Sequence, residues 1–116
     1  MDIRWIFSRP PKPMNHVNGF DWDEGNRDKC QKHGVPLVII EAAFSRPIDI
    51  LPDLKHSNHE TRFLAIGKTE EGRGVFICFT LRRQDRNVLI RPISARFMNA
   101  KEVAYYDQTP AHPDDR

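Results

Sequence analysis

The stretch from Asn87 to Arg96 (NVLIRPISAR) combines an apolar run with side chains that can bind an anion. Val88, Leu89 and Ile90 are typical of a buried β-strand. An arginine inside such a strand must meet an anion or lie on an open face, because burying an unpaired charge is costly. The planar guanidinium group donates two parallel hydrogen bonds to a phosphate or a carboxylate. The sequence therefore predicts either a phosphate-binding strand or arginines that pair with the chain's own carboxylates.

Positive charge is concentrated late in the chain. The 116 residues carry a formal net charge of only +2, which does not by itself identify a nucleic-acid-binding protein. Between positions 82 and 101 the only acidic residue is Asp85. The basic residues of this stretch are Arg82, Arg83, Arg86, Arg91, Arg96 and Lys101. This local excess favours phosphate binding, and we expect Arg96 to be the leading phosphate ligand, followed by Arg82 and Arg91.

Strand geometry decides which of these side chains lie together. Residues two apart on a regular strand point to the same face, so Ser94 and Arg96 are predicted to share one. Arg91 points to the other face unless Pro92 introduces a bulge. Ser94 is expected to pack or to form a hydrogen bond at the phosphate site. No pattern in the chain resembles a serine-hydrolase triad or a glycine loop that holds phosphate.

Glu60 and Arg62 form a second pair at a spacing of two, and the same rule places them on one face of a predicted strand. Two interpretations are open. The carboxylate acts as a base while the guanidinium group clamps an anion, or the two side chains neutralise each other.

His33 is the leading residue for proton transfer, because histidine is the side chain whose charge changes most readily near neutral pH. It follows Lys32 at the predicted end of a helix. At that position both side chains can instead bind the free carbonyl groups of the last helical turn. We therefore keep two roles open for each: His33 in catalysis or capping, and Lys32 in phosphate binding or capping.

A metal site is a competing hypothesis. Cys30 and His33 are three residues apart, as are His56 and His59. These spacings resemble those of zinc ligands. Burial of the cysteine and capping by His33 explain the same residues without a metal. We expect no metal and no cofactor, with a zinc-binding protein as the third hypothesis.

Two short helices are predicted at the start of the domain. The first is capped by Asp21 or Asp23 and ends at Gly34, which suits a left-handed C-cap. The second begins at Pro36 and ends before Pro47, so the two helices meet at a tight Gly-Val-Pro corner.

The rest of the domain is predicted to be a sheet and a final helix. Strands are expected at Ile48–Leu51, Thr61–Lys68, Val75–Arg82 and Asn87–Arg96, and Asn99 can cap the last helix. The third strand is apolar almost throughout, so it is expected to be central and covered on both faces. Short polar turns connect the last three strands. The fold class is therefore α+β: two N-terminal helices, a four-stranded antiparallel meander and one C-terminal helix.

The chain is predicted to form one domain, at residues 19–108. Residues 1–18 contain several prolines and are expected to form an extension, and residues 109–116 a disordered tail. Two cysteines do not make a disulfide framework. The apolar stretch at residues 3–7 is too short for a signal-peptide core, and no later segment approaches a membrane span. We expect a cytoplasmic protein that does not bind membranes.

Four motifs in order resemble those of the BrnT family of bacterial toxins. They are WDE at Trp22–Glu24, KHGV at Lys32–Val35, ETRF at Glu60–Phe63 and ISAR at Ile93–Arg96. Each motif is weak alone, but their order and spacing are specific. The resemblance covers about residues 20–106.

The resemblance implies a RelE-like fold and a ribonuclease toxin of a type II toxin–antitoxin system. Such a toxin cuts RNA and slows translation, and a BrnA-like antitoxin covers it and binds operator DNA, so that the toxin reaches DNA only through its partner. On this reading cleavage is metal-independent, and the expected catalytic residues are His33, Lys32, Glu60, Arg62 and Arg96. The expected phosphate ligands are Arg82, Arg91, Arg96 and Ser94. The alternative is a non-catalytic module whose basic sheet binds RNA or a protein.

Overall fold

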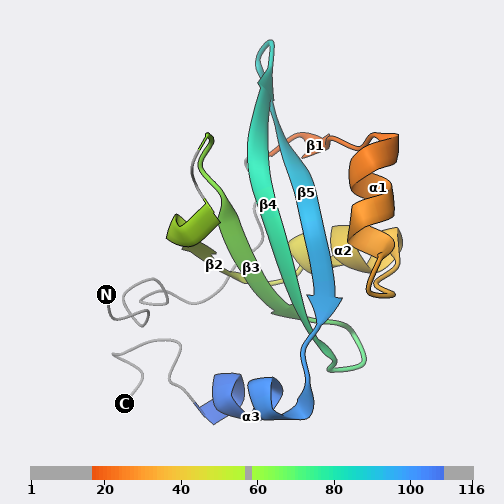
Figure 1. The fold of residues 1–116 in the computed structure, drawn as a ribbon, viewed down its shortest axis with the longest axis vertical. Coiled ribbons are helices and arrows are strands. Elements are labelled where there is room, and N and C mark those ends of the chain that lie inside the picture. The colour runs from red at the N-terminus through yellow and green to blue at the C-terminus, as the bar shows by residue number, and fades with distance from the viewer. Residues whose placement is uncertain (1–16, 57–58, 109–116) are drawn as a thin grey trace.

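The structure is a computed structural model that describes residues 17–56 and 59–108. Most of the predicted extension and the whole predicted tail lie outside the described residues. The elements in chain order are β1 (Gly19–Phe20), α1 (Glu24–Gln31), α2 (Leu37–Phe44), β2 (Asp49–Pro52), the short 3-10 helix η2 (Leu54–His56), β3 (Phe63–Lys68), β4 (Gly74–Gln84), β5 (Asn87–Phe97) and α3 (Ala100–Gln108). Figure 1 shows α1 beside β5, α2 behind the sheet and α3 below it.

The strands form one mixed sheet in the order β1-β5-β4-β3-β2. The four predicted strands are present and pair antiparallel. The predicted sheet is nevertheless incomplete, because β1 adds a fifth strand parallel to β5. The backbone N–H groups of Asn18 and Asp21 donate to the carbonyls of Val88 and Ile90, each at 2.8 Å. Two residues are too few for a detectable alternation of polar and apolar side chains, so no pattern in the sequence indicated this strand.

The strand β4 lies at the centre of the sheet, as its apolar sequence predicted. It is fully covered on only one face, however. Ile77 and Phe79 are buried, whereas Phe76 and Cys78 on the other face are half-buried. The expectation of two covered faces is therefore wrong, because α2 packs behind the sheet and no helix covers the front of β4 along most of its length (Figure 1), as far as the described residues show.

The two N-terminal helices start and stop close to the predicted residues. Asp23 is the N-cap of α1: its side chain accepts from the backbone N–H of Asn26 at 2.9 Å, and the Asn26 side chain accepts from the backbone N–H of Asp23 at 2.7 Å. Gly34 has a φ of 84°, as a left-handed C-cap requires. The helix itself ends at Gln31, so His33 lies in the following turn rather than in the last helical turn.

The core lies between the sheet and the two N-terminal helices. Phe79 is fully buried at its centre. Its ring contacts Phe44 of α2 edge-on, with centroids 5.1 Å apart, and stacks on Phe63 of β3 at 5.4 Å. Large aromatic side chains of this kind supply much of the apolar area that holds a small domain together. The core thereby fixes β3, β4 and β5 relative to one another.

The helix α3 is attached differently. Asn99 caps it as predicted, because the Asn99 side chain accepts from the backbone N–H of Glu102 at 2.8 Å. None of the α3 residues is buried. Within the described residues, no helix has the length and apolar character needed to cross a membrane.

Candidate functional site

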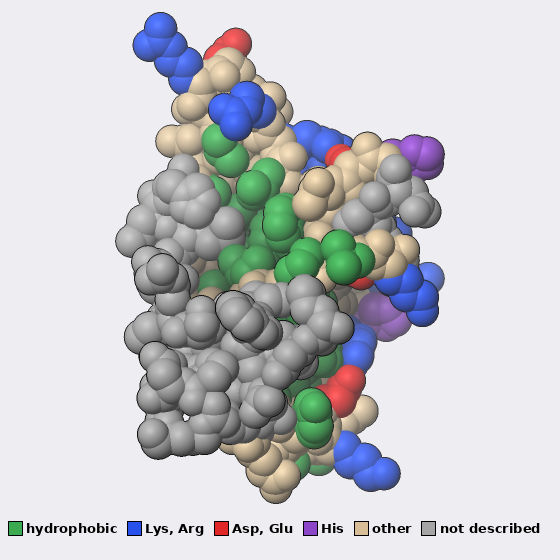
Figure 2. Space-filling model, turned by 90° about the vertical axis from the view of Figure 1, so that its left-hand side faces the viewer, with side chains coloured by type: hydrophobic (Ala, Val, Ile, Leu, Met, Phe, Trp, Pro, Cys, Tyr) green, Lys and Arg blue, Asp and Glu red, His purple; other side chains and the backbone are tan. Residues whose placement is uncertain are grey.

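The face of the sheet opposite α2 carries the polar side chains, and we call it the open face. It consists of the outward side chains of β3, β4 and β5. In Figure 2 the histidine side chains and several charged ones lie along the right-hand edge of the view, other charged side chains lie at the top, and hydrophobic side chains lie in the centre. Any site for an anionic ligand is therefore to be sought on the open face.

A β-bulge interrupts β5 in the middle of this face. Cys78 pairs with Ser94, but the next residue of β4, Phe79, pairs with Pro92. Ile93 is therefore left without a partner in the ladder. An extra residue of this kind reverses the alternation of side chains along the strand beyond it.

The bulge places both predicted anion-binding arginines of β5 on the open face. Before the bulge Ile90 is buried and Arg91 points outward, and after it Ala95 is buried while Ser94 and Arg96 point outward. The sequence predicted that Arg91 would share a face with Arg96 only if the chain bulged near Pro92. The bulge is present, and the two arginines share the face.

Asn26 connects α1 to the bulge. Its side-chain amide is 7% exposed and donates to the carbonyl oxygens of Pro92 at 2.9 Å and Asp21 at 3.0 Å. Its side-chain oxygen accepts from the backbone N–H of Asp23. A buried amide with all of these groups satisfied fixes the helix start against the bulged strand.

We describe two depressions of the open face that described residues line. The upper hollow, towards the β4–β5 turn, has a volume of about 680 Å³. The residues that define it here are Lys29, Glu60, Arg62, Arg82, Arg91 and Ile93. The lower hollow, towards α3, has a volume of about 260 Å³. Its defining residues are His33, Leu64, Phe76, Cys78, Ser94 and Arg96. The two adjoin along β5, since Ile93 lines one and Ser94 the other.

Carboxylates hold the arginines of the upper hollow. Arg82 forms an ion pair with Glu60. Arg91 donates to Asp23 at 2.8 Å and to Asp21 at 3.4 Å. The backbone N–H of Asn26 and the guanidinium group of Arg91 lower the pKa of Asp23 below its usual value, so this partner is ionised at neutral pH. These pairs fix where the guanidinium groups lie and neutralise part of their charge.

Arg96 in the lower hollow is held in the same manner, but by α3. Two of its nitrogen atoms donate to the two carboxylate oxygens of Glu102, each at 2.8 Å. The guanidinium carbon lies 4.6 Å from the centroid of the Phe76 ring, a cation–π arrangement. Hydrogen bonds from Arg96 and from the backbone of Asn99 lower the pKa of Glu102 to about 2. Glu102 therefore occupies the position that a phosphate bound by Arg96 would take.

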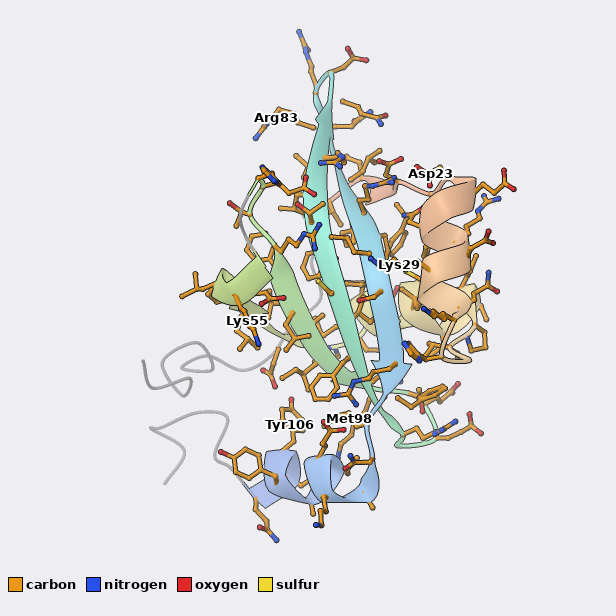
Figure 3. The ribbon with its side chains drawn as sticks, in the orientation of Figure 1. Asp23, Lys29, Lys55, Arg83, Met98 and Tyr106 are labelled. Carbon is orange, nitrogen blue, oxygen red and sulfur yellow. The ribbon has the colours of Figure 1, made fainter. Side chains whose placement is uncertain are left out.

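Two further polar contacts attach α3 to the domain. Tyr106 donates a hydrogen bond to Asp49, and Figure 3 shows its side chain pointing from α3 to the sheet. Partial burial of the half-exposed Tyr106 side chain, together with this carboxylate partner, raises the pKa of its hydroxyl. Lys68 forms an ion pair with Asp107 at 2.6 Å.

The structure divides the predicted site residues between the two hollows. His33, Ser94 and Arg96 come together in the lower hollow. Glu60, Arg62, Arg82 and Arg91 line the upper one. Lys32 is the C-cap residue of α1 and is not among the lining residues of either hollow. Glu60 and Arg62 lie before β3, which begins at Phe63, so the prediction that they share one face of a strand is wrong. Glu60 instead forms an ion pair with Arg82 of β4.

Three residues at the site were not predicted. Lys29 lines the upper hollow, and its place in the last turn of α1 indicates no such role. Asn26 has a local signal that was missed, since an Asx residue three positions after an N-cap aspartate can complete a capping box. Phe76 lies under Arg96, and nothing in the sequence near either residue indicates this contact.

The described residues do not support the zinc hypothesis. No group of three metal-ligating His, Cys, Asp or Glu side chains occurs among them, and the side chain of His56 lies outside the description. Cys30 is fully buried in the core. Burial raises the pKa of its thiol to about 11, which disfavours the thiolate that binds a metal.

Comparison with known proteins gave one family. The model of a family described as "Ribonuclease toxin, BrnT, of type II toxin-antitoxin system" matches residues 22–102. The matched range begins beside the N-cap of α1 and ends at Glu102 in α3, so it includes the residues that define both hollows. No curated protein matched the chain.

Proposed function

Because the chain belongs to the BrnT family of ribonuclease toxins of type II toxin–antitoxin systems, we propose that it cleaves RNA on its open face, with the lower hollow as the cleavage site. The observation that carries this proposal is the meeting of His33, Ser94 and Arg96 in one depression. The first comes from the turn after α1 and the other two from β5 beyond the bulge. A proton-transfer group and an anion-binding group thus face the same space.

The proposed reaction uses the ribose hydroxyl of the RNA as the nucleophile. The 2′-oxygen loses its proton, forms a bond to the neighbouring phosphorus and displaces the 5′-oxygen of the next nucleotide, which takes up a proton. The products are a 2′,3′-cyclic phosphate and a 5′-hydroxyl end. This route needs no metal ion, and we propose that none is used.

Three residues of the lower hollow have proposed roles. His33 is exposed and accepts or supplies the proton at the reacting oxygens. Arg96 stabilises the charge that develops on the phosphate, as a fixed guanidinium group does best. Ser94 forms a hydrogen bond to the same phosphate. Glu102 competes with the phosphate for Arg96, so the substrate must displace it in part.

The test is cleavage of RNA by the purified full chain in the presence of EDTA. The native protein should produce cyclic-phosphate ends, and His33→Ala should lose that activity while still binding RNA. His59→Ala is the matched control, because His59 is also exposed and lies outside the residues of both hollows. Full activity in His33→Ala would refute the site, and activity only with added metal would refute the metal-free route.

The partner we propose is a BrnA-like antitoxin that covers the toxin and carries the complex to operator DNA. Membership of a type II toxin family supports an antitoxin partner in general. A RelE-like fold is part of the same proposal. Expression of the chain alone should arrest growth, and co-expression of the neighbouring gene should relieve the arrest. The chain and the product of that gene should purify together.

A non-catalytic module is the second candidate, and one observation favours it. Carboxylate partners within the chain hold Arg82, Arg91 and Arg96. Pairing with the chain's own carboxylates was one of the two alternatives that the sequence left open for the arginines of β5. Such pairs reduce the charge available to a substrate. This candidate predicts salt-sensitive RNA binding without cleavage, so the assay in EDTA separates the two.

A further inference from the structure

The upper hollow is larger than a single phosphate requires. Its volume of about 680 Å³ is in the range that holds a small organic ligand. The residues that line it include four cations and three carboxylates. The hollow is therefore polar, slightly positive and spacious, which suits a nucleotide better than a lone anion.

Lys29 is the cation of this hollow that remains available for a ligand. Within the described part of the chain, no carboxylate lies within ion-pair distance of Lys29, whereas Arg82 and Arg91 are both paired. Figure 3 shows the Lys29 side chain extending from α1 towards β5. A phosphate in the upper hollow can thus be bound by Lys29 without first displacing a carboxylate from it.

Ile93 supplies the apolar part of the hollow. It is the bulge residue, half-buried and unpaired in the ladder, and it lines the hollow beside Arg91. An apolar side chain next to a guanidinium plane offers a surface on which a nucleobase can stack. Cations together with such a surface are what a single-stranded nucleic acid requires.

Arg91 and Arg96 are too far apart for one phosphate to contact both. They are five positions apart in the sequence but only four ladder steps apart, because Ile93 has no ladder partner, and four steps span about 13 Å at the usual strand rise. The bulge keeps both arginines on one face, so a strand of RNA lying along β5 meets them in succession. Different phosphates of one RNA chain then occupy the two hollows.

We propose that the upper hollow is a second RNA subsite, in which Lys29 binds a phosphate of a nucleotide next to the cleaved segment and Ile93 contacts its base. This inference rests on the proposed cleavage in the lower hollow. It adds a prediction that cleavage alone does not make. Removal of the Lys29 side chain should not affect cleavage of short substrates that fill only the lower hollow. It should weaken the binding of longer substrates.

The experiment compares Lys29→Ala with Arg27→Ala on a dinucleotide and on a longer single-stranded RNA. Arg27 is the matched control, because it is an exposed cation of the same helix outside the lining residues. For Lys29→Ala we expect kcat/KM on the longer RNA to fall about tenfold through KM, with no change on the dinucleotide. The salt dependence of log KM should lose about 0.7 of its slope, the value for one phosphate contact on a single strand.

Three results would overturn the subsite. The first is an equal loss on both substrates, and the second is an equal loss in Arg27→Ala. The third is a Lys29→Ala variant that binds RNA normally but loses affinity for the antitoxin, because the hollow would then be a protein-binding surface. Unchanged unfolding midpoints would verify that both variants fold.

Failure of the proposed function would look different. If the native chain cleaves no RNA, cleavage in the lower hollow is refuted. The subsite is then tested by the fluorescence anisotropy of the two labelled RNAs. A preference for the longer RNA that Lys29→Ala removes and Arg27→Ala keeps would uphold the subsite, and the absence of such a preference would refute it.

Discussion

In both hollows of the open face a carboxylate holds an arginine, but the carboxylates belong to different parts of the fold. In the upper hollow Arg91 is held by Asp21 and Asp23, two carboxylates just before α1, and buried Asn26 ties that segment to the bulge of β5. In the lower hollow Arg96 is held by Glu102 of α3, a helix that buries none of its residues. The first arrangement is part of the folded core, and the second can change without unfolding it.

The comparison indicates that the upper hollow positions the RNA and that the reaction takes place in the lower hollow. A hollow that is continuous with the buried framework suits a contact that positions a ligand, because its geometry does not depend on a helix that is attached only by surface contacts. A hollow that is closed by polar contacts suits the reacting group, since these contacts can exchange for contacts to the substrate. The predictions below test this division.

The largest expected difference lies between two matched arginines. Arg96→Ala should lower kcat about 100-fold to 1000-fold, because it removes a donor to the charge that develops in the transition state. Arg82→Ala in the upper hollow should leave kcat nearly unchanged and raise KM. Steady-state kinetics on one fluorescent RNA would measure both. Equal losses of kcat would remove the distinction between the hollows.

Stability should show the opposite order. Asn26→Ala leaves the carbonyls of Asp21 and Pro92 without their donor and should lower the free energy of unfolding by about 2–3 kcal/mol. Glu102→Ala should shift the urea midpoint only slightly, because α3 contributes no buried side chain. A larger midpoint shift for Glu102→Ala would place α3 within the cooperative core.

RNA affinity should rise when the internal competitor of the lower hollow is weakened. Glu102→Gln removes the negative charge beside Arg96 and should tighten RNA binding about threefold, the scale of an exposed ion pair. Glu71→Gln is the control, because it makes the same charge change at an exposed position of the β3–β4 turn. Equal changes in the two variants would assign the effect to net charge alone.

The smallest effect is in the pH dependence of α3. The pKa of Glu102 is about 2 in the folded chain against a usual value of 4.5. A lowered folded-state pKa gives stabilisation that is complete above about 4.5 and is lost as the pH falls towards 2. Carboxyl NMR titration should show this low pKa, and Arg96→Ala should raise it towards the usual value. A Glu102 that titrates near 4.5 in the native chain would argue against the ion pair.

The sequence predicted what depends on neighbouring residues. The N-cap before α1, the glycine that ends it and the cap of α3 all follow from residues within a few positions of one another. The position of β4 in the sheet followed from its continuous apolar run. The possible bulge followed from Pro92, because proline removes a donor from the ladder.

What the sequence could not predict depends on contacts between distant segments. Asp21 and Arg91 are 70 positions apart, and neither local pattern indicates the other. The same applies to Asn26 and the carbonyl of Pro92, 66 positions apart. The division of the predicted site residues into two hollows likewise needs the sheet register and the path of α1.

The bulge at Ile93 also determines how mutations in this part of the gene would affect the open face. Deletion of this one codon would leave Arg91 and Arg96 four positions apart in a regular strand, so both would stay on the open face. A substitution at Pro92 that removed the bulge at constant chain length would instead leave them five positions apart, on opposite faces. The shared face therefore depends on the bulge and the chain length together, so that a point mutation can break it where a deletion preserves it.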